Sequence, residues 1–430
     1  ASWVASSKSQ LYTIKEMSAS HAASLPDLPE EVGQYDFDEV IDRNDDGVPA
    51  LKSHPIVVGN NQKDLFAAGV ADMDFKVAKP IRDAMQKRLQ HGIFGYETTR
   101  DGLIPSLVEW QSDRHGWKVQ PEEILRSPNI LNALSMAACL YTDRGDGVIV
   151  QPPVFFDFFD ILSENDRRLI SNPLILTDGG RYEMDFDGLE KVASDPSAKL
   201  LFLCNPHNPI GRVWTRDELR KMGDICLKHN VIVVSDDIHG DIVLKDDVRY
   251  TPFASLGPEY AQNSITCISP AKSFNVAACC CSFTVVPNTT KRVAFKAENS
   301  RLTVNKNNAF ANVAMEAAYK HGGPWLEAVI AYLKLNLDLV RERLKDIRGV
   351  ELVEPEGTFL LWIDFRGLGM ASQDDLTAFL RQKARWAITR GAAFGKEGEG
   401  FGRLNIACPR SKLAAALDDL EQAVEARIEA

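Results

Sequence analysis

Short apolar runs rich in β-branched residues alternate with amphipathic stretches through the middle of the chain, and this alternation restricts the possible folds more than any other feature. Each run is short enough to be a strand buried on both faces of a sheet. The runs lie at 147–150, 199–204, 231–234 and 265–268. Strands that alternate with helices predict right-handed strand–helix–strand units and a mainly parallel sheet between helices. We therefore expect a large α/β domain.

The last third of the chain has a different pattern. It predicts a long helix over about 325–347, followed by strands at 350–353 and 358–363 around a turn. A helix that begins after Ser372, a strand at 403–407 and a terminal helix at 411–428 complete the pattern. These elements predict a smaller C-terminal domain of the α+β type.

The two patterns divide the chain into three parts. We expect residues 1–65 to be an N-terminal arm and lead-in that packs with the small domain. Residues 66–315 then form the large domain and residues 316–430 the small one. A chain of 430 residues is long enough for two such domains.

Charge and hydropathy exclude several classes of partner. The chain has 60 acidic and 49 basic residues and a formal net charge of −11. This balance argues against binding to nucleic acid or to an anionic membrane, and no apolar stretch approaches the roughly 20 residues of a membrane span. We expect a small-molecule substrate instead.

The eight cysteines predict a reducing, cytoplasmic setting. None is arranged as CxxC, and all except Cys408 lie in apolar or strand-like surroundings, which is typical of buried free thiols. The run from Cys279 to Cys281 could be a metal cluster. Adjacent side chains on a strand point to opposite faces, however, so we interpret this run as packing.

Polar segments follow three of the predicted strands, at 205–211, 235–239 and 269–275. Ligands of open α/β sheets bind outside the carboxyl ends of the strands, so Asn208, Asp236 and Lys272 should meet at one edge. A lysine beside an acid that can pair with a pyridinium nitrogen suits the chemistry of pyridoxal 5′-phosphate (PLP). Each of these residues taken alone is common at such a position. The three segments in this order are a far more specific signal of PLP chemistry.

This ordered set, NPxNPxG, then SDxIH, then SxxKSFN, resembles the fold-type I PLP enzymes of the class I/II aminotransferase superfamily. Segments at 70–75, 91–96, 400–405 and 408–413 are similar to the MalY/PatB group of cystathionine β-lyases. The resemblance runs from about Tyr35 to the C-terminus. It implies the fold-type I architecture and PLP as the cofactor.

The resemblance also implies residues that hold PLP. Lys272 would form the internal Schiff base, and Asp236 would bind the ring nitrogen. The remaining cofactor-binding residues would be Asn208 and His239 at the phenolic oxygen, Ser269 and the turn Asn129, Ile130 and Leu131 at the phosphate, and Phe155 against the ring. Phe155 stands where this group usually carries Tyr, and no phosphate-binding arginine follows Lys272.

Three further residues are implied outside the cofactor contacts. Arg403 would clamp the substrate α-carboxylate. Asp72 would line the substrate pocket or fix the loop around Met73. Tyr96 would reach the phosphate of a neighbouring subunit, which implies a homodimer with shared active sites.

The implied activity is that of a carbon–sulfur β-lyase, which cleaves cystathionine-like or other cysteine S-conjugates to a thiol, pyruvate and ammonia. An aminotransferase that acts on an amino acid and a 2-keto acid is the alternative, because it would use every one of the same cofactor contacts. A non-catalytic regulatory protein with a PLP fold is a further alternative, although intact Lys272, Asp236 and Arg403 argue against it. No second arginine is placed to bind a distal carboxylate, so varied sulfur substituents should be tolerated.

Overall fold

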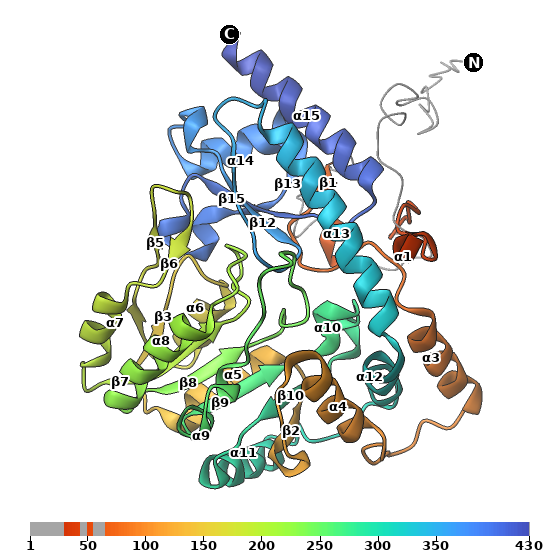
Figure 1. Cartoon of the computed structure of the whole chain (residues 1–430), viewed down its shortest axis with the longest axis vertical. Coiled ribbons are helices and arrows are strands. Elements are labelled where there is room, and N and C mark those ends of the chain that lie inside the picture. The colour runs from red at the N-terminus through yellow and green to blue at the C-terminus, as the bar shows by residue number, and fades with distance from the viewer. Residues whose placement is uncertain (1–29, 44–49, 55–64, 430) are drawn as a thin grey trace, which may run out of the picture.

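A computed structural model of the protein describes residues 30–43, 50–54 and 65–429 and has a seven-stranded sheet between helices, with a smaller unit above it (Figure 1). The strand order is β2-β10-β9-β8-β7-β3-β4. β10 runs antiparallel to both of its neighbours, β2 and β9, and every other pair of adjacent strands in this sheet is parallel. The bounds are β2 Ile124–Ser127, β3 Gly147–Val150, β4 Arg168–Ser171, β7 Ala198–Cys204, β8 Ile232–Asp236, β9 Ser264–Ile268 and β10 Ser282–Val285. The predicted α/β fold is confirmed.

Alternate side chains along the central strands explain why this sheet is covered on both faces. Leu200 and Phe202 of β7 pack in one core cluster with helices α5 (Ile130–Tyr141) and α6 (Asp157–Glu164). Leu201 and Leu203 point the other way and pack with α7 (Phe186–Ala193) and α8 (Arg216–Lys228). Both faces are therefore dry, as expected for continuous apolar runs in parallel strands.

Other helices complete the large unit. The short α10 (Pro270–Ser273) follows β9 directly, and α12 packs against α3 and α4. The bounds of these and the remaining helices are α3 Lys79–His91, α4 Leu103–His115, α9 Pro258–Gln262, α11 Thr289–Arg301 and α12 Ala309–His321. A capping box formed by Thr215 and Glu218 begins α8.

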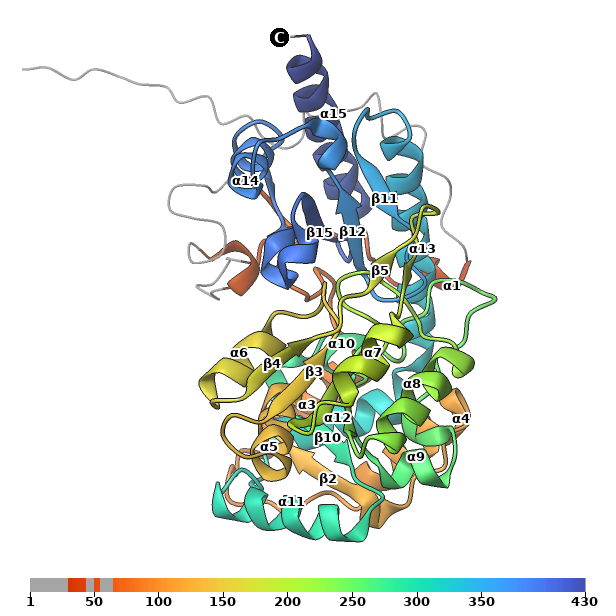
Figure 2. The same cartoon turned by 90° about the vertical axis from the view of Figure 1, so that its left-hand side faces the viewer.

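The C-terminal unit is built on a four-stranded antiparallel sheet with the order β11-β12-β15-β14. It lies at the upper end of the molecule in Figures 1 and 2, flanked by long helices. The bounds are β11 Glu351–Val353, β12 Leu360–Asp364, β14 Thr389–Arg390, β15 Phe401–Asn405, α13 Gly323–Leu344, α14 Gln373–Gln382 and α15 Arg410–Ile428. The predicted strand at 403–407 begins two residues earlier, and the predicted helix at 325–347 ends at Leu344.

Two short strand pairings lie outside these sheets, and one of them joins distant parts of the chain. Strand β1 (Phe66–Ala67) pairs in parallel with β13 (Trp386–Ala387), and β5 (Ile175–Leu176) forms a hairpin with β6 (Tyr182–Glu183). The first turn of chain described, α1 (Glu30–Gly33), packs on α13. Most of the predicted arm at 1–65 lies outside the described residues, and the three-part division of the chain stays a prediction.

The cysteine predictions were wrong at three positions. All eight cysteines are free thiols, but Cys139 and Cys280 are exposed and Cys408 is fully buried. Cys408 is buried because it follows β15 into the core beneath α13. Cys280 does not lie on a strand: it follows the 3-10 turn Ala277–Cys279 in a left-handed conformation with φ 49°. Within the described ranges no cluster of His, Cys, Asp and Glu could hold a metal. The packing interpretation fits Cys281, which is buried, and is wrong for Cys280, which is exposed. None of the described helices is long and apolar enough to span a membrane.

A buried ion pair joins the two units. The Arg212 Nε donates to Glu356 Oε2 over 2.9 Å, and both side chains are almost completely buried. The backbone N–H of Val213 donates to the same carboxylate oxygen, and the Glu356 N–H donates to the Gly211 carbonyl. This cluster fixes the loop after β7 to the turn before β12.

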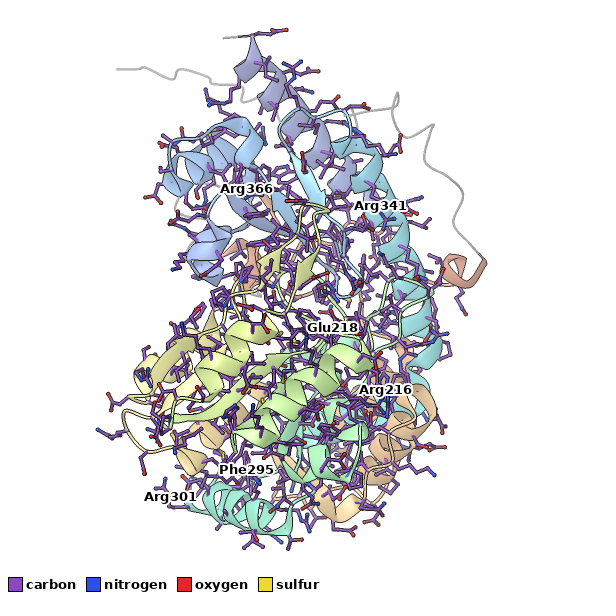
Figure 3. All side chains as sticks on the ribbon, turned by 60° about the vertical axis from the view of Figure 1, so that its left-hand side comes forward. Arg216, Glu218, Phe295, Arg301, Arg341 and Arg366 are labelled. Atoms are coloured by element: carbon purple, nitrogen blue, oxygen red, sulfur yellow. The ribbon has the colours of Figure 1, made fainter. Side chains whose placement is uncertain are left out.

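We expect Glu356→Ala to lower the free energy of unfolding by about 3 kcal/mol, because Arg212 would stay buried with part of its counter-charge removed. Urea denaturation measures this loss. The matched control is Glu354→Ala, two residues earlier. Glu354 pairs with Arg341, and both side chains of this pair are substantially exposed. Arg341 lies on α13 at the side of the C-terminal unit (Figure 3). The control should therefore lose less than about 1 kcal/mol. Equal losses in the two variants would contradict this account.

Candidate active site

A cavity of about 290 Å³ opens at the carboxyl ends of β3, β7, β8 and β9. This is the edge of an open α/β sheet at which ligands are expected. Most of the predicted site residues line it, namely Asn129, Ile130, Leu131, Phe155, Asn208, Asp236, His239, Ser269 and Lys272. The topology therefore brings together side chains from segments almost 150 residues apart in sequence.

Lys272 reaches this cavity from α10, directly after β9. Its Nζ donates to the backbone carbonyl of Ala71 over 2.5 Å. Burial and, to a smaller extent, the charge on Arg403 lower the pKa of Lys272 to about 8, although Asp72 and other acids act in the opposite direction. Near neutral pH this lysine is therefore far more often an uncharged amine than an exposed lysine is, so it can act as a nucleophile or a base.

Asp236 is the last residue of β8, and only 4% of it is exposed. Its carboxylate accepts a hydrogen bond from the Ile238 N–H over 3.2 Å, and the described residues place no side-chain donor on it. Burial raises the pKa of Asp236 to about 7. A buried carboxylate at a ligand cavity with no cation of its own suits a cationic N–H donor from a ligand.

Arg403 lies behind Asn208 rather than in the cavity wall. Its Nη1 donates to Asn208 Oδ1 over 2.9 Å, and its Nη2 donates to the Gly69 carbonyl over 2.6 Å. Because Oδ1 is the acceptor, the amide NH2 of Asn208 is left to donate toward the cavity. Burial lowers the pKa of Arg403 to about 9, and its Nε is buried without a partner in the described structure.

His239 adds a polar side chain to the cavity wall, and Phe155 adds an apolar one. His239 is fully buried, and its Nδ1 has no hydrogen-bond partner within the described residues. Burial, with the charges of Lys272 and Arg403, holds the pKa of His239 well below its usual value, so the ring is neutral. Phe155 supplies an apolar face and packs against Phe156 at a centroid distance of 5.0 Å.

The N-terminus of α5 forms the end of the cavity. Asn129 caps this helix, since its Oδ1 accepts from the Asn132 N–H over 2.8 Å. The other first-turn N–H groups have no intrahelical acceptor and favour an anion. Ser269 lies near this end, where its hydroxyl donates to the Cys281 carbonyl over 2.9 Å and accepts from the Ala271 N–H.

Two further predicted residues, like Arg403, lie outside the cavity wall. Asp72 forms a bidentate pair with Arg43, at 2.9 and 2.7 Å, and so fixes the loop around Met73. Tyr96 lies in the extended segment between α3 and α4 and is fully exposed. Neither arrangement tests the substrate or subunit role expected for the residue, and both roles stay predictions.

Some residues that line the cavity, notably Asp157 and Cys280, are not among the predicted site residues. Asp157 begins α6, shortly after β3 ends. Its position in the sequence could have revealed it, because an acid that follows a predicted parallel strand lies at the same sheet edge as Asp236. Cys280 was missed because its segment was interpreted as a strand.

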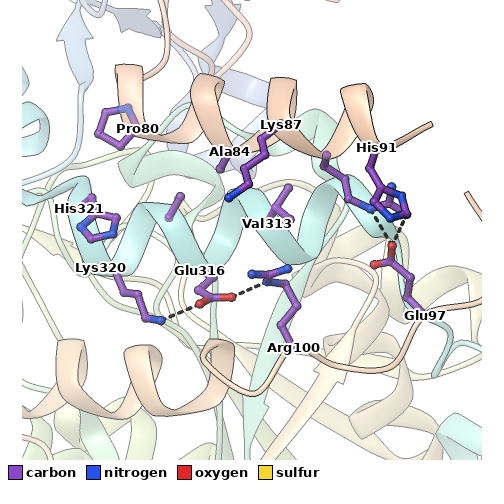
Figure 4. Close-up of a pocket in the computed structure, with 12 residues that line it drawn as sticks. Pro80, Ala84, Lys87, His91, Glu97, Arg100, Val313, Glu316, Lys320 and His321 are labelled. Carbon is purple, nitrogen blue, oxygen red and sulfur yellow. Dashed lines mark hydrogen bonds and ion pairs between the residues drawn. The ribbon is translucent and has the colours of Figure 1, made fainter. Parts of the chain in front are cut away.

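A larger hollow of about 540 Å³ lies elsewhere, between α3 and α12 (Figure 4). Apart from Lys87, the lysine, arginine and glutamate side chains that line it pair among themselves. Glu316 contacts both Arg100 and Lys320 at 2.6 Å, and Glu97 pairs with Arg88. None of the predicted site residues lines it.

The sheet, the smaller C-terminal sheet and the lysine at the strand ends together define an α/β enzyme with a lysine-centred active site. The family model for aminotransferase class I and II matches residues 64–420, and the chain belongs to this family. The predicted superfamily is confirmed.

Individual relatives show which members of this family the chain is similar to. The chain is 42% identical over 362 residues to cystathionine beta-lyase PatB from Bacillus subtilis (strain 168), covering 84% of this chain and 93% of that protein. Cystalysin from Treponema denticola, whose structure contains PLP, matches with a TM-score of 0.86 at 32% identity, covering 91% of this chain and 99% of its own. The PLP-bound C-S lyase from Staphylococcus hominis matches with a TM-score of 0.83 at 30% identity, covering 91% and 98%.

The depressed pKa of Lys272 predicts unusual reactivity in the cofactor-free protein. Only the neutral amine reacts with acetic anhydride, so acetylation of Lys272 should rise with pH around a midpoint of about 8. Mass spectrometry of the peptide that contains Lys272 measures this. A short unstructured lysine peptide is the control and should show a midpoint near 10.4. The same midpoint for Lys272 and the control would contradict the assignment.

Proposed function

We propose that the protein is a PLP-dependent carbon–sulfur β-lyase that converts cysteine S-conjugates, cystathionine among them, to a thiol, pyruvate and ammonia. The observation that carries this proposal is the 42% identity to cystathionine beta-lyase PatB over 93% of that protein. The cavity supports this proposal, because the residues that line it can each hold the part of PLP predicted for them.

The fit follows from the groups that lack partners. Asp236 is a buried acceptor for the protonated ring nitrogen, and the Asn208 amide is a donor for the phenolic oxygen. The first turn of α5, with Ser269 nearby, suits the phosphate, and Phe155 suits the ring face. When bound, PLP supplies an aldehyde that joins amines and a ring that accepts the electron pair left at a substrate Cα.

Three residues of the chain have separate roles in the proposed reaction. The Arg403 guanidinium binds the α-carboxylate of the substrate and fixes its orientation. The Lys272 amine would act as the base that removes the Cα proton. Asp236 keeps the ring nitrogen protonated, because a carboxylate beside that cation favours the charged form of both groups.

The Lys272 ammonium formed by proton removal lies at the same cavity wall and can return its proton as the carbon–sulfur bond breaks. The electron pair of that bond leaves with sulfur, so a thiol departs. Water completes the balance: one cysteine S-conjugate and one water give one thiol, one pyruvate and one ammonia. No oxidant or keto acid enters this equation.

We also propose that the active unit is a homodimer. The segment that carries Tyr96 exposes Ile93 and Phe94 as well, and neighbouring exposed apolar side chains suit a subunit interface. Tyr96 would there reach the phosphate site of the partner subunit. A reducing, cytoplasmic setting fits the eight free thiols.

The aminotransferase is the second candidate, because it would use the same contacts. The proposed lyase should form pyruvate from L-cystathionine over many turnovers without any added keto acid. An aminotransferase would stop after one turnover per site until a keto acid is supplied. Lys272→Ala is the control and should lower the rate by several orders of magnitude, because it removes the base. Strict dependence on a keto acid would contradict the lyase proposal.

A further inference from the structure

One acidic side chain in the cavity has no part in the scheme above. Asp157 is the first residue of α6 and lines the cavity together with Lys272 and Asn208. It is half-buried, and the described residues offer its carboxylate no hydrogen bond or ion pair. The other acid in this wall, Asp236, lies at the end of β8 and is already assigned to the cofactor ring.

The surroundings of Asp157 fit a carboxylate that a ligand completes. Burial is the main effect and raises the pKa of Asp157, with the nearby Asp160 acting in the same direction. Arg403 and Lys272 oppose this effect, which places Asp157 within electrostatic reach of both substrate-handling groups. Its position in the first turn of α6 also favours the ionised form, because helix N-termini stabilise negative charge.

Position then limits which part of a substrate can meet Asp157. In the proposed reaction the α-carboxylate of the substrate is bound by Arg403 and the α-amino group joins the cofactor. The substituent on sulfur is the part left to contact the remaining wall. Lys272 is the one lysine or arginine among the residues that line the cavity, so a distal carboxylate would meet Asp157 without a compensating cation.

We propose that Asp157 is a specificity-determining residue that binds a cationic nitrogen on the sulfur substituent. The preferred substrates are then cysteine S-conjugates whose substituent carries an ammonium or another positively charged N–H donor. This inference rests on the proposed β-lyase function and narrows the broad tolerance expected from the sequence.

A helix-capping role for Asp157 makes a different prediction. If its charge only stabilised the first turn of α6, its removal would affect every substrate equally. A positioning role through Arg403 would likewise weaken all substrates together, since all share the α-carboxylate. Only direct contact with the sulfur substituent changes the ranking of substrates.

The test uses the PLP-loaded enzyme and three substrates of similar size: S-(2-aminoethyl)-L-cysteine, S-propyl-L-cysteine and S-carboxymethyl-L-cysteine. Pyruvate release gives kcat/KM for each. The leaving thiols differ in acidity, so the measured quantity is the change in the aminoethyl-to-propyl ratio between wild type and Asp157→Asn. We expect this ratio to fall about tenfold or more, as for loss of a hydrogen bond between charged groups, while the S-propyl value stays within about twofold.

Asp160→Asn is the matched control, because Asp160 is an exposed acid on the same helix that does not line the cavity. It should leave the ratio unchanged. An unchanged ratio in Asp157→Asn, or an equal loss for all three substrates, would overturn the assignment. A wild-type preference for the S-carboxymethyl substrate would overturn it even if Asp157→Asn does not fold. Absence of pyruvate from every substrate would instead contradict the proposed lyase.

Discussion

The site depends on one electrostatic constraint: the carboxylate of Asp236 is buried at the end of β8 with a single backbone N–H as its described partner. Taking a carboxylate out of water is costly unless a cation or several donors replace the water. The described residues supply no side-chain partner, and burial raises the pKa of Asp236 to about 7. A bound pyridinium is the missing partner in the proposed function.

The fold holds this constraint in place by topology. Parallel pairing of β7, β8 and β9 sets their carboxyl ends side by side, so Asn208, Asp236 and Lys272 follow from three adjacent strands. The C-terminal unit adds Arg403 from β15, and its bond to Asn208 orients an amide in the other unit. The buried Arg212–Glu356 pair keeps these two units in register.

The residues at the carboxyl edge of the sheet could be predicted because the end of a strand is marked by residues that are adjacent in sequence. Runs of apolar residues that stop at Asp236 or before Ser269 reveal both the strand and its end. Features that depend on distant packing were not predictable in the same way. Cys408 is buried by α13, and the conformation of Cys280 follows from a turn that its apolar neighbours conceal. Asp157 was visible as an acid after a strand, but only the cavity distinguishes it from an ordinary helix-start acid.

The most direct test of the central claim compares the melting temperatures of wild type and Asp236→Asn at pH 8, each with and without saturating PLP. Without PLP, an amide avoids the cost of a buried charge, so the variant should melt at the same temperature as wild type or higher. With PLP, wild type should gain more than the variant, because only a carboxylate compensates the pyridinium charge. A variant that melts lower without PLP and gains as much as wild type with it would contradict the account.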